Sequence, residues 1–294
     1  MRNLPNHFAK VFGNGALYAS GTTFGDTVTP GTSGAWGTDV QLIDGSTEWP
    51  ADFGDAYELE ITATGAAVAG QACTTWLSLG YHATGGASRS TDLMDPLLVH
   101  GVTMTAGRFG TTYTFKLYVP NGWSIFAKAS NSGASAGTLS VAIKLRGCPS
   151  NPEDVKCGTY VKAYGLSGSS PTLAATAVTP GTTGTKGSYA TLGTVGTDDY
   201  PFWWQFGINL NNTTINNNAS AWDVAVGDGT TRTHVIEDVN AGGNTSEEFT
   251  RGTCGGFYAA QPGDTVESRG AVVGSPALAT YYAVAYAVCG QMEV

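Results

Sequence analysis

Charged side chains are scarce in this sequence. Asp, Glu, Lys and Arg make up 13% of its 294 residues, about half of the ~25% that is usual in soluble proteins. Acidic residues outnumber basic ones by 23 to 14, and residues 151–294 hold 13 acidic and 6 basic side chains. The acidic second half would repel a phosphate backbone, and no basic cluster interleaved with aromatic residues is present. We therefore expect no nucleic-acid partner.

Long apolar runs are also missing. The longest, residues 281–289, spans nine residues, far fewer than the ~20 that cross a bilayer, so we expect no membrane insertion. Residues 1–10 carry Arg2 and Lys10 without an apolar run behind them, unlike a secretory signal peptide. We expect a chain that is not exported by that route.

Metal-binding and cofactor-binding motifs are lacking as well. The five cysteines include no CxxC pair, which argues against a disulfide framework and a zinc site. Cys148 and Cys289 are expected to be buried thiols, with a Cys148–Cys157 bridge as the alternative. Paired acids at 198–199, 237–238 and 247–248 lack the spacing of a calcium loop. The sequence also has no GxGxxG or GKS/T motif, so we expect no metal and no cofactor.

Two weak catalytic patterns occur, and neither leads us to expect an enzyme. Ser135 lies in a GASAG sequence, but a strand and not a helix is expected after it, unlike a nucleophile elbow. Glu48, Asp52 and Asp55 alternate with aromatic residues, as in a glycosidase site. The second half of the chain does not keep these acids, and a solvated strand entrance explains them equally well.

Glycine is abundant, and a glycine-containing turn occurs twice. There are 41 glycines in 294 residues, about twice the usual ~7%. Residues 28–34 (VTPGTSG) return as residues 178–184 (VTPGTTG). The features that follow keep their order in both halves, with an offset that drifts from 150 to 141. The matched pairs are Phe53 with Phe202, Trp76 with Trp222, and Val141, Ile143 and Leu145 with Tyr282, Val284 and Tyr286. This order indicates a tandem duplication.

Apolar and polar residues alternate along short segments between Gly, Pro and Asn turns, which predicts antiparallel strands and no long helix. We therefore predict an all-β fold of two tandem antiparallel β-sandwich domains, jelly-roll-like, with an immunoglobulin-like sandwich as the alternative. The predicted parts are an N-terminal arm (1–15), a first sandwich (16–148), a linker (149–157) and a second sandwich (158–294).

Two groups of residues are candidates for contacts with partners. Residues 1–15 match nothing in the second half, so Phe8, Val11 and Phe12 are expected to dock on a neighbouring subunit, with a frayed terminus as the alternative. Trp203 and Trp204 are adjacent, so a strand would direct one to each face, and one of them is expected to be exposed. Trp123 follows an Asn-Gly turn. These tryptophans are candidates for glycan or partner contact, with burial in the core as the alternative.

The leading arm, the duplicated turn, the strands rich in Gly, Thr and Ala, and the low charge together resemble tandem jelly-roll structural proteins of tailed-bacteriophage virions and gene transfer agents. That resemblance implies a non-enzymatic head or tail subunit of the spike, fibre-base or decoration type, assembled in the bacterial cytoplasm and located in the virion. It implies a trimer or pentamer, docking on other virion proteins through the arm, and host-surface polysaccharide as a candidate partner. A free lectin-like carbohydrate-binding module and a glycan-degrading enzyme are the alternatives.

Overall fold

The structure, a computed structural model, consists of strands and turns in the part of the chain that it describes. The described residues are 8–12, 25–49, 53–66, 71–104, 108–134, 137–147, 156–182, 184–209, 218–243, 248–249, 253–273 and 281–290. They contain 21 strands. Within this part no helix is present that is long and apolar enough to cross a membrane. The all-β prediction is confirmed.

The first domain is a sandwich of two antiparallel sheets. One sheet has the order β2-β10-β4-β8, with β1 also paired with β10, and the other has the order β3-β9-β5-β7, with β6 also paired with β5. Along the chain, β2, β3, β4 and β5 alternate between the two sheets, β5 and β7 lie in the same sheet, and β8, β9 and β10 alternate again, which is the jelly-roll order. The bounds are β1 (Phe8–Phe12), β2 (Asp26–Val28), β3 (Val40–Ile43), β4 (Ala56–Ala66), β5 (Gln71–His82), β6 (Thr91–Asp92), β7 (Leu97–Met104), β8 (Arg108–Phe115), β9 (Ser124–Asn131) and β10 (Leu139–Gly147).

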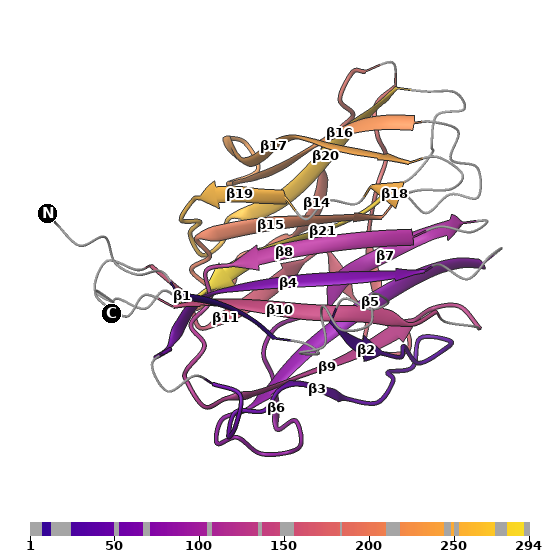
Figure 1. The fold of residues 1–294 in the computed structure, drawn as a ribbon. Coiled ribbons are helices and arrows are strands. Elements are labelled where there is room, and N and C mark those ends of the chain that lie inside the picture. Colours follow the sequence, from indigo (N-terminus) through magenta and orange to yellow (C-terminus); the bar gives the residue numbers. More distant parts are fainter. Residues whose placement is uncertain are drawn as a thin grey trace, which may run out of the picture.

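The second domain repeats this order. Its sheets are β13-β21-β15-β19, with β11 also paired with β21 and β12 with β13, and β14-β20-β16-β17-β18. The bounds are β11 (Tyr160–Tyr164), β12 (Leu166–Ser167), β13 (Ala174–Val178), β14 (Ala190–Thr194), β15 (Trp203–Asn209), β16 (Asn218–Gly227), β17 (Arg232–Gly243), β18 (Glu248–Phe249), β19 (Thr253–Phe257), β20 (Thr265–Val273) and β21 (Tyr281–Cys289). The chain is therefore two tandem jelly-roll domains related by internal duplication, and they lie side by side (Figure 1).

The duplicated turn has the same geometry in both domains. Gly34 and Gly184 both have φ +80°, a left-handed conformation that favours glycine. The Gly34 N–H donates to the carbonyl of Asn131 at 2.8 Å, and the Gly184 N–H donates to that of Val272 at 3.3 Å. In each domain the turn thus lies against the last but one strand, β9 in the first and β20 in the second. The repeated sequence therefore forms the same backbone structure twice.

The first strand of each domain is interrupted. Residues of β1 pair with the second half of β10, and β2 pairs with its first half. In the second domain β11 and β13 pair with β21 in the same way. Residues 8–12 therefore have a structural counterpart, Tyr160–Tyr164, that sequence comparison did not find. The predicted docking role of Phe8, Val11 and Phe12 stays a prediction.

The last strands of the two domains differ in burial. In β10, apolar and partly exposed residues alternate, so one face forms the first core and the other faces outward. Almost every residue of β21 is buried. Its inner face supplies Ala283, Ala285 and Ala287 to the second core. Its outer face, with Val284 and Tyr286, belongs to the core cluster of the first domain. One apolar core therefore extends across the boundary between the domains.

Candidate functional sites: the domain junction and a polar network

Both predicted strand tryptophans are buried. Trp203 is 8% and Trp204 0% exposed. The Trp204 indole N–H donates to the Tyr258 carbonyl and that of Trp203 donates to the Thr114 carbonyl, both at 2.9 Å. The two rings point to opposite faces of β15. Trp204 lies in the core of the second domain, and the first domain covers the face that carries Trp203. The expectation that one of them is exposed is wrong, and neither ring face is open to a sugar.

Trp123 is the one predicted contact tryptophan whose ring is partly exposed. It stacks on Tyr81 with ring centroids 3.9 Å apart and planes 4° apart. The Trp49 indole N–H donates to the Trp123 carbonyl at 2.9 Å. These three side chains form an aromatic group at one end of the first domain, which we call the Trp123 group. Its flat, partly exposed rings are of the kind that contact sugars or protein partners.

The acids that resembled a glycosidase pair support local backbone structure. Asp55 accepts hydrogen bonds from the Tyr118 hydroxyl and the Asn121 N–H, each at 2.8 Å. Glu48 accepts one from the Asp44 N–H at 2.6 Å. These contacts fit the interpretation of a strand entrance. Four further residues from the sequence patterns lie outside the described residues: Asp52, Ser135, Cys148 and Glu247.

Two cysteines are buried thiols. Cys157 and Cys289 are free in the structure, so the bridge between Cys148 and Cys157 is not formed. Burial raises the pKa of Cys157 to about 11 and that of Cys289 to about 12. Because the thiolate is the reactive species, both groups are poor nucleophiles at neutral pH.

The junction between the domains is centred on Tyr286. Its ring lies edge-on to Tyr113 of the first domain, with centroids 5.4 Å apart. Its hydroxyl accepts a hydrogen bond from the Leu98 N–H at 2.7 Å and donates one to the Pro96 carbonyl at 3.2 Å. Burial raises the pKa of Tyr286 well above its usual value, so the hydroxyl remains a donor. The outer face of β21 thereby closes the β7–β8 edge of the first sandwich.

Close approach of the two domains requires a glycine on β15. A Cβ atom at Gly207 would lie 2.6 Å from the Tyr113 hydroxyl and 3.5 Å from the Leu98 Cβ. Beside it, Lys116 lies over the Trp203 ring, with Nζ 5.6 Å from the centroid. Such a cation–π contact is electrostatically attractive. The junction thus combines apolar burial with directed polar contacts.

Backbone hydrogen bonds also cross the junction. The Gly158 N–H donates to the Lys116 carbonyl and the Tyr118 N–H donates to the Gly158 carbonyl, both at 2.9 Å. The Asp95 carboxylate accepts a bond from the Ala163 N–H at 2.7 Å. Residues that follow the predicted linker therefore pair with the residues directly after β8, which fixes the orientation of the second domain. The two domains therefore have a fixed orientation relative to each other.

The duplicated turn of the first domain forms a third contact with the second domain. The interruption of the second domain's first strand, residues 165–173, reaches the turn. There the Ser170 hydroxyl donates to the Gly34 carbonyl at 2.7 Å. A Cβ atom at Gly34 would lie 2.0 Å from the Pro171 carbonyl oxygen. Leu166 and Leu173 pack against the first core. The turn that marks the duplication is therefore also part of the junction.

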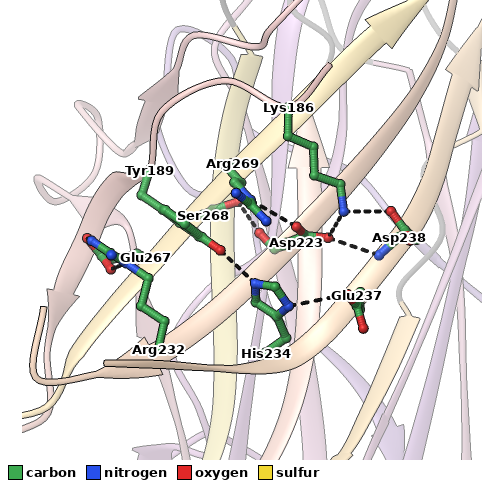
Figure 2. Close-up of polar contacts among 10 residues, drawn as sticks. All are labelled: Lys186, Tyr189, Asp223, Arg232, His234, Glu237, Asp238, Glu267, Ser268 and Arg269. Carbon is green, nitrogen blue, oxygen red and sulfur yellow. Dashed lines mark hydrogen bonds and ion pairs between the residues drawn. The ribbon is translucent and has the colours of Figure 1, made fainter. Parts of the chain in front are cut away.

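A polar network lies on the outer face of the second domain's β14-β20-β16-β17 sheet (Figure 2). At its centre is Asp223, which is fully buried. Its carboxylate accepts hydrogen bonds from Lys186 at 2.6 Å, Arg269 at 3.0 Å and the Asp238 N–H at 3.1 Å. Burial opposes its ionisation, but these donors outweigh burial and hold the pKa of Asp223 below its usual value. Asp223 is thus a buried anion that joins three strands and a loop.

An aromatic ring extends this network. Tyr189 lies between the guanidinium groups of Arg232 and Arg269, whose central carbons are 4.6 and 4.5 Å from the ring centroid. Its hydroxyl is 2.6 Å from Nε2 of His234, and Nδ1 of His234 is 3.3 Å from Glu237. Figure 2 shows these groups in contact across β17 and β20. Each cation here faces an acid or a ring, an arrangement that stiffens a sheet surface.

No protein-family model and no curated protein matches the chain. Solved structures show distant likenesses. The MCP of STIV, the Sulfolobus Turreted Icosahedral Virus, aligns with 96% of this chain and 97% of its own at 9% identity and a TM-score of 0.39. The cowpea mosaic virus top component aligns with 99% of this chain and 91% of its own at 8% identity and 0.32. The tandem CBM22 domains of Paenibacillus barcinonensis Xyn10C align with 97% and 92% at 12% identity and 0.28. At this distance the likenesses assign no function.

Proposed function

We propose that the chain is a non-enzymatic structural subunit of a virus particle. It would lie on the head or tail surface as a spike, fibre-base or decoration subunit and contribute to particle architecture and host-surface attachment. The observation that carries this proposal is the junction, in which one jelly-roll domain closes the edge of another through Tyr286 and crossing backbone bonds. A symmetric shell or appendage needs subunits of fixed shape, and this junction supplies one.

The charge distribution supports a polarity for this subunit. The first 150 residues carry 8 basic and 10 acidic side chains, whereas the remaining residues carry 6 and 13. The less acidic first domain, with Phe8, Val11 and Phe12 on β1, is our candidate for docking on other virion proteins. The more acidic second domain would project outward. The candidate docking strand, β1, lies at the edge of a sheet, where its backbone is able to pair with a neighbouring protein.

Replacing Phe8, Val11 and Phe12 together by Ser should abolish incorporation into particles. Three apolar anchors would be lost, which lowers affinity by more than about tenfold even at a modest ~0.5 kcal/mol each. The measurement is recovery of a tagged copy with particles on a density gradient, from cells that produce the particle. A matched control is Thr230→Asp at an exposed turn of the second domain. Equal recovery of the triple variant and the wild type would refute docking through β1, and absence of the wild-type chain from particles would refute the virion role.

A free carbohydrate-binding module is the second candidate, and the Trp123 group favours it. Its stacked rings, 3.9 Å apart, are partly exposed, and exposed aromatic rings are the groups that pack on a pyranose ring. In that case the protein should bind a glycan as a monomer and lose at least about tenfold in affinity on Trp123→Ala, for a lost stacking contact of about 1.4 kcal/mol. A glycan array followed by titration calorimetry provides the measurement. A wild-type protein that binds no glycan on the array eliminates this candidate.

A further inference from the structure

The junction within the chain is heterologous, because it joins different surfaces of two similar domains. The second domain contributes the outer face of β21 and β15 and the interruption at residues 165–173. The first domain contributes the β7–β8 edge and the duplicated turn. Each jelly roll has both a face and an edge of this kind. Among the described residues, the equivalent face of the first domain and the equivalent edge of the second domain do not meet such a partner within the chain, although β18 and β19 border β8 of the first domain. We call them the left-over face and the left-over edge.

The left-over edge on the second domain presents apolar groups. Phe257 on β19 packs edge-on against Trp203 of the junction, with centroids 4.8 Å apart, and is still 60% exposed; Val273 at the end of β20 is 57% exposed. Val273 adjoins the second copy of the turn. Near a Cβ built at Gly184 the one described neighbour within 4 Å is Val273, at 3.6 Å. In the first domain the second domain covers the corresponding positions, since Lys116 meets Trp203 and Gly34 meets Ser170.

The left-over face on the first domain is hollowed. A hollow of about 250 Å³ lies on the outer side of β4 and β10, lined by Glu60, Thr62, Thr64, Ser140, Ala142, Ile143 and Lys144. Pairing identifies its counterpart in the second domain: Lys144 pairs with Glu60 as Tyr286 pairs with Gln205. The hollow therefore lies at the place on the first domain that is equivalent to the place of Tyr286 on the second domain. It is placed to receive groups from an edge like the one that receives Tyr286.

We propose that a second copy of this chain repeats the junction between subunits, with the β4–β10 face of its first domain docked on the β17–β19 edge and the second turn of this chain. The inference rests on the proposed function and names the partner for that assembly. Because the contact is heterologous, repeating it generates a ring when the rotation closes. The β4–β10 face, which would form the contact between chains, carries Glu60, Thr62 and Lys144. The equivalent positions in the internal junction are Gln205, Gly207 and Tyr286. A polar face suits a subunit that folds alone and assembles afterwards.

Two substitutions block the two surfaces separately. Val273→Asp places a charge on the exposed edge, and Ala142→Arg fills the hollow on the face. We expect the wild type to form a discrete oligomer in light scattering and each variant to have the mass of a single chain. Ser88→Asp, in the exposed loop between β5 and β6 of the first domain, lies on neither surface and should assemble like the wild type. Both altered positions are at least partly exposed, so thermal unfolding should show that each variant remains folded.

Mixing the two variants tests the heterologous arrangement itself. The Val273→Asp chain keeps an intact face and the Ala142→Arg chain keeps an intact edge, so an equimolar mixture should form dimers and nothing larger. A wild type that stays monomeric at all concentrations, or an oligomer unchanged by both variants, overturns this inference. A mixture without dimers does so as well. The gradient assay with particles is independent of these masses, so failure of the inference and failure of the virion role are distinguishable.

Discussion

Replacing Tyr286 by Ala should lower the free energy of unfolding by about 3 to 5 kcal/mol, as large aromatic truncations in cores do. The ring is fully buried between the domains, and its hydroxyl is the acceptor for the Leu98 N–H at 2.7 Å. Truncation leaves a cavity and an unsatisfied buried donor together. For domains of this size we expect the melting temperature to fall by the order of 10 °C. Calorimetry is the measurement, and it should also resolve two transitions, because the domains lose their coupling.

Two controls separate these contributions. Tyr286→Phe keeps the ring and removes only the hydroxyl, so it should cost about 1 to 3 kcal/mol, the penalty for a buried polar group without its partner. Tyr282→Ala alters the same strand at a partly exposed ring and should cost less than Tyr286→Ala. A Tyr286→Ala protein that melts within a degree of the wild type, in a single transition, would show that the junction does not hold the domains together.

The sequence was sufficient to predict the class of fold. Alternation in residues 139–145 marks one buried face, and the structure has Leu139, Val141, Ile143 and Leu145 in the first core. The duplicated turn was a reliable marker because its geometry depends on a glycine with positive φ. Both signals are local, and local signals are what a sequence displays directly.

The junction was not predictable for a physical reason. Residues 281–289 are apolar at nearly every position, because β21 is buried on both faces. A strand with no polar face gives no sign of which residues point inward. The sequence comparison matches Val284 and Tyr286 to Ile143 and Leu145. The strand pairing of the two domains shows that Ala285 and Ala287 are the true equivalents of Ile143 and Leu145. A shift of one residue exchanges the two faces of a strand, so Val284 and Tyr286, which the sequence matched to residues of the first core, lie in the junction. Trp203 is buried for the same reason, because the first domain covers the outer face of its strand, β15.

The polar network was missed although its residues were visible. Asp223 interrupts the apolar strand Trp222–Val226, which is a signal for an outward polar position, and Asp238 was noted only as half of an acidic pair. Bringing Lys186, Asp223 and Arg269 together depends on the pairing of β16 with β20 and on register shifts between β16 and β17. Bulges redirect side chains without a clear sequence signature.

Replacing Asp223 by Ala should cost about 2 to 3 kcal/mol. Removing one member of a fully buried ion pair costs about 3 to 5 kcal/mol. The value here is lower because Lys186 and Arg269 are 21% and 27% exposed and are partly screened by water. Chemical denaturation followed by fluorescence is the measurement. Asp238→Asn is the matched control, because Asn tolerates the positive φ of 51° at this position. Asp238 binds the same Lys186 but is 67% exposed, so loss of its charge should cost less than about 1 kcal/mol. Equal effects of the two variants would contradict a central role for Asp223.

The same carboxylate should determine how stability responds to acid. The pKa of Asp223 is lower in the folded protein than its usual value, so its contribution is complete above about pH 4, the unfolded pKa of Asp. It is lost as the pH falls through the lower folded value, because protonation of the buried carboxylate then breaks its bonds to Lys186 and Arg269. Melting temperatures between pH 7 and pH 2 should therefore decline more steeply in the wild type than in Asp223→Asn, whose amide does not titrate. Parallel curves for the two proteins would mean that other carboxylates, such as Asp199 with its own lowered pKa, dominate the acid response.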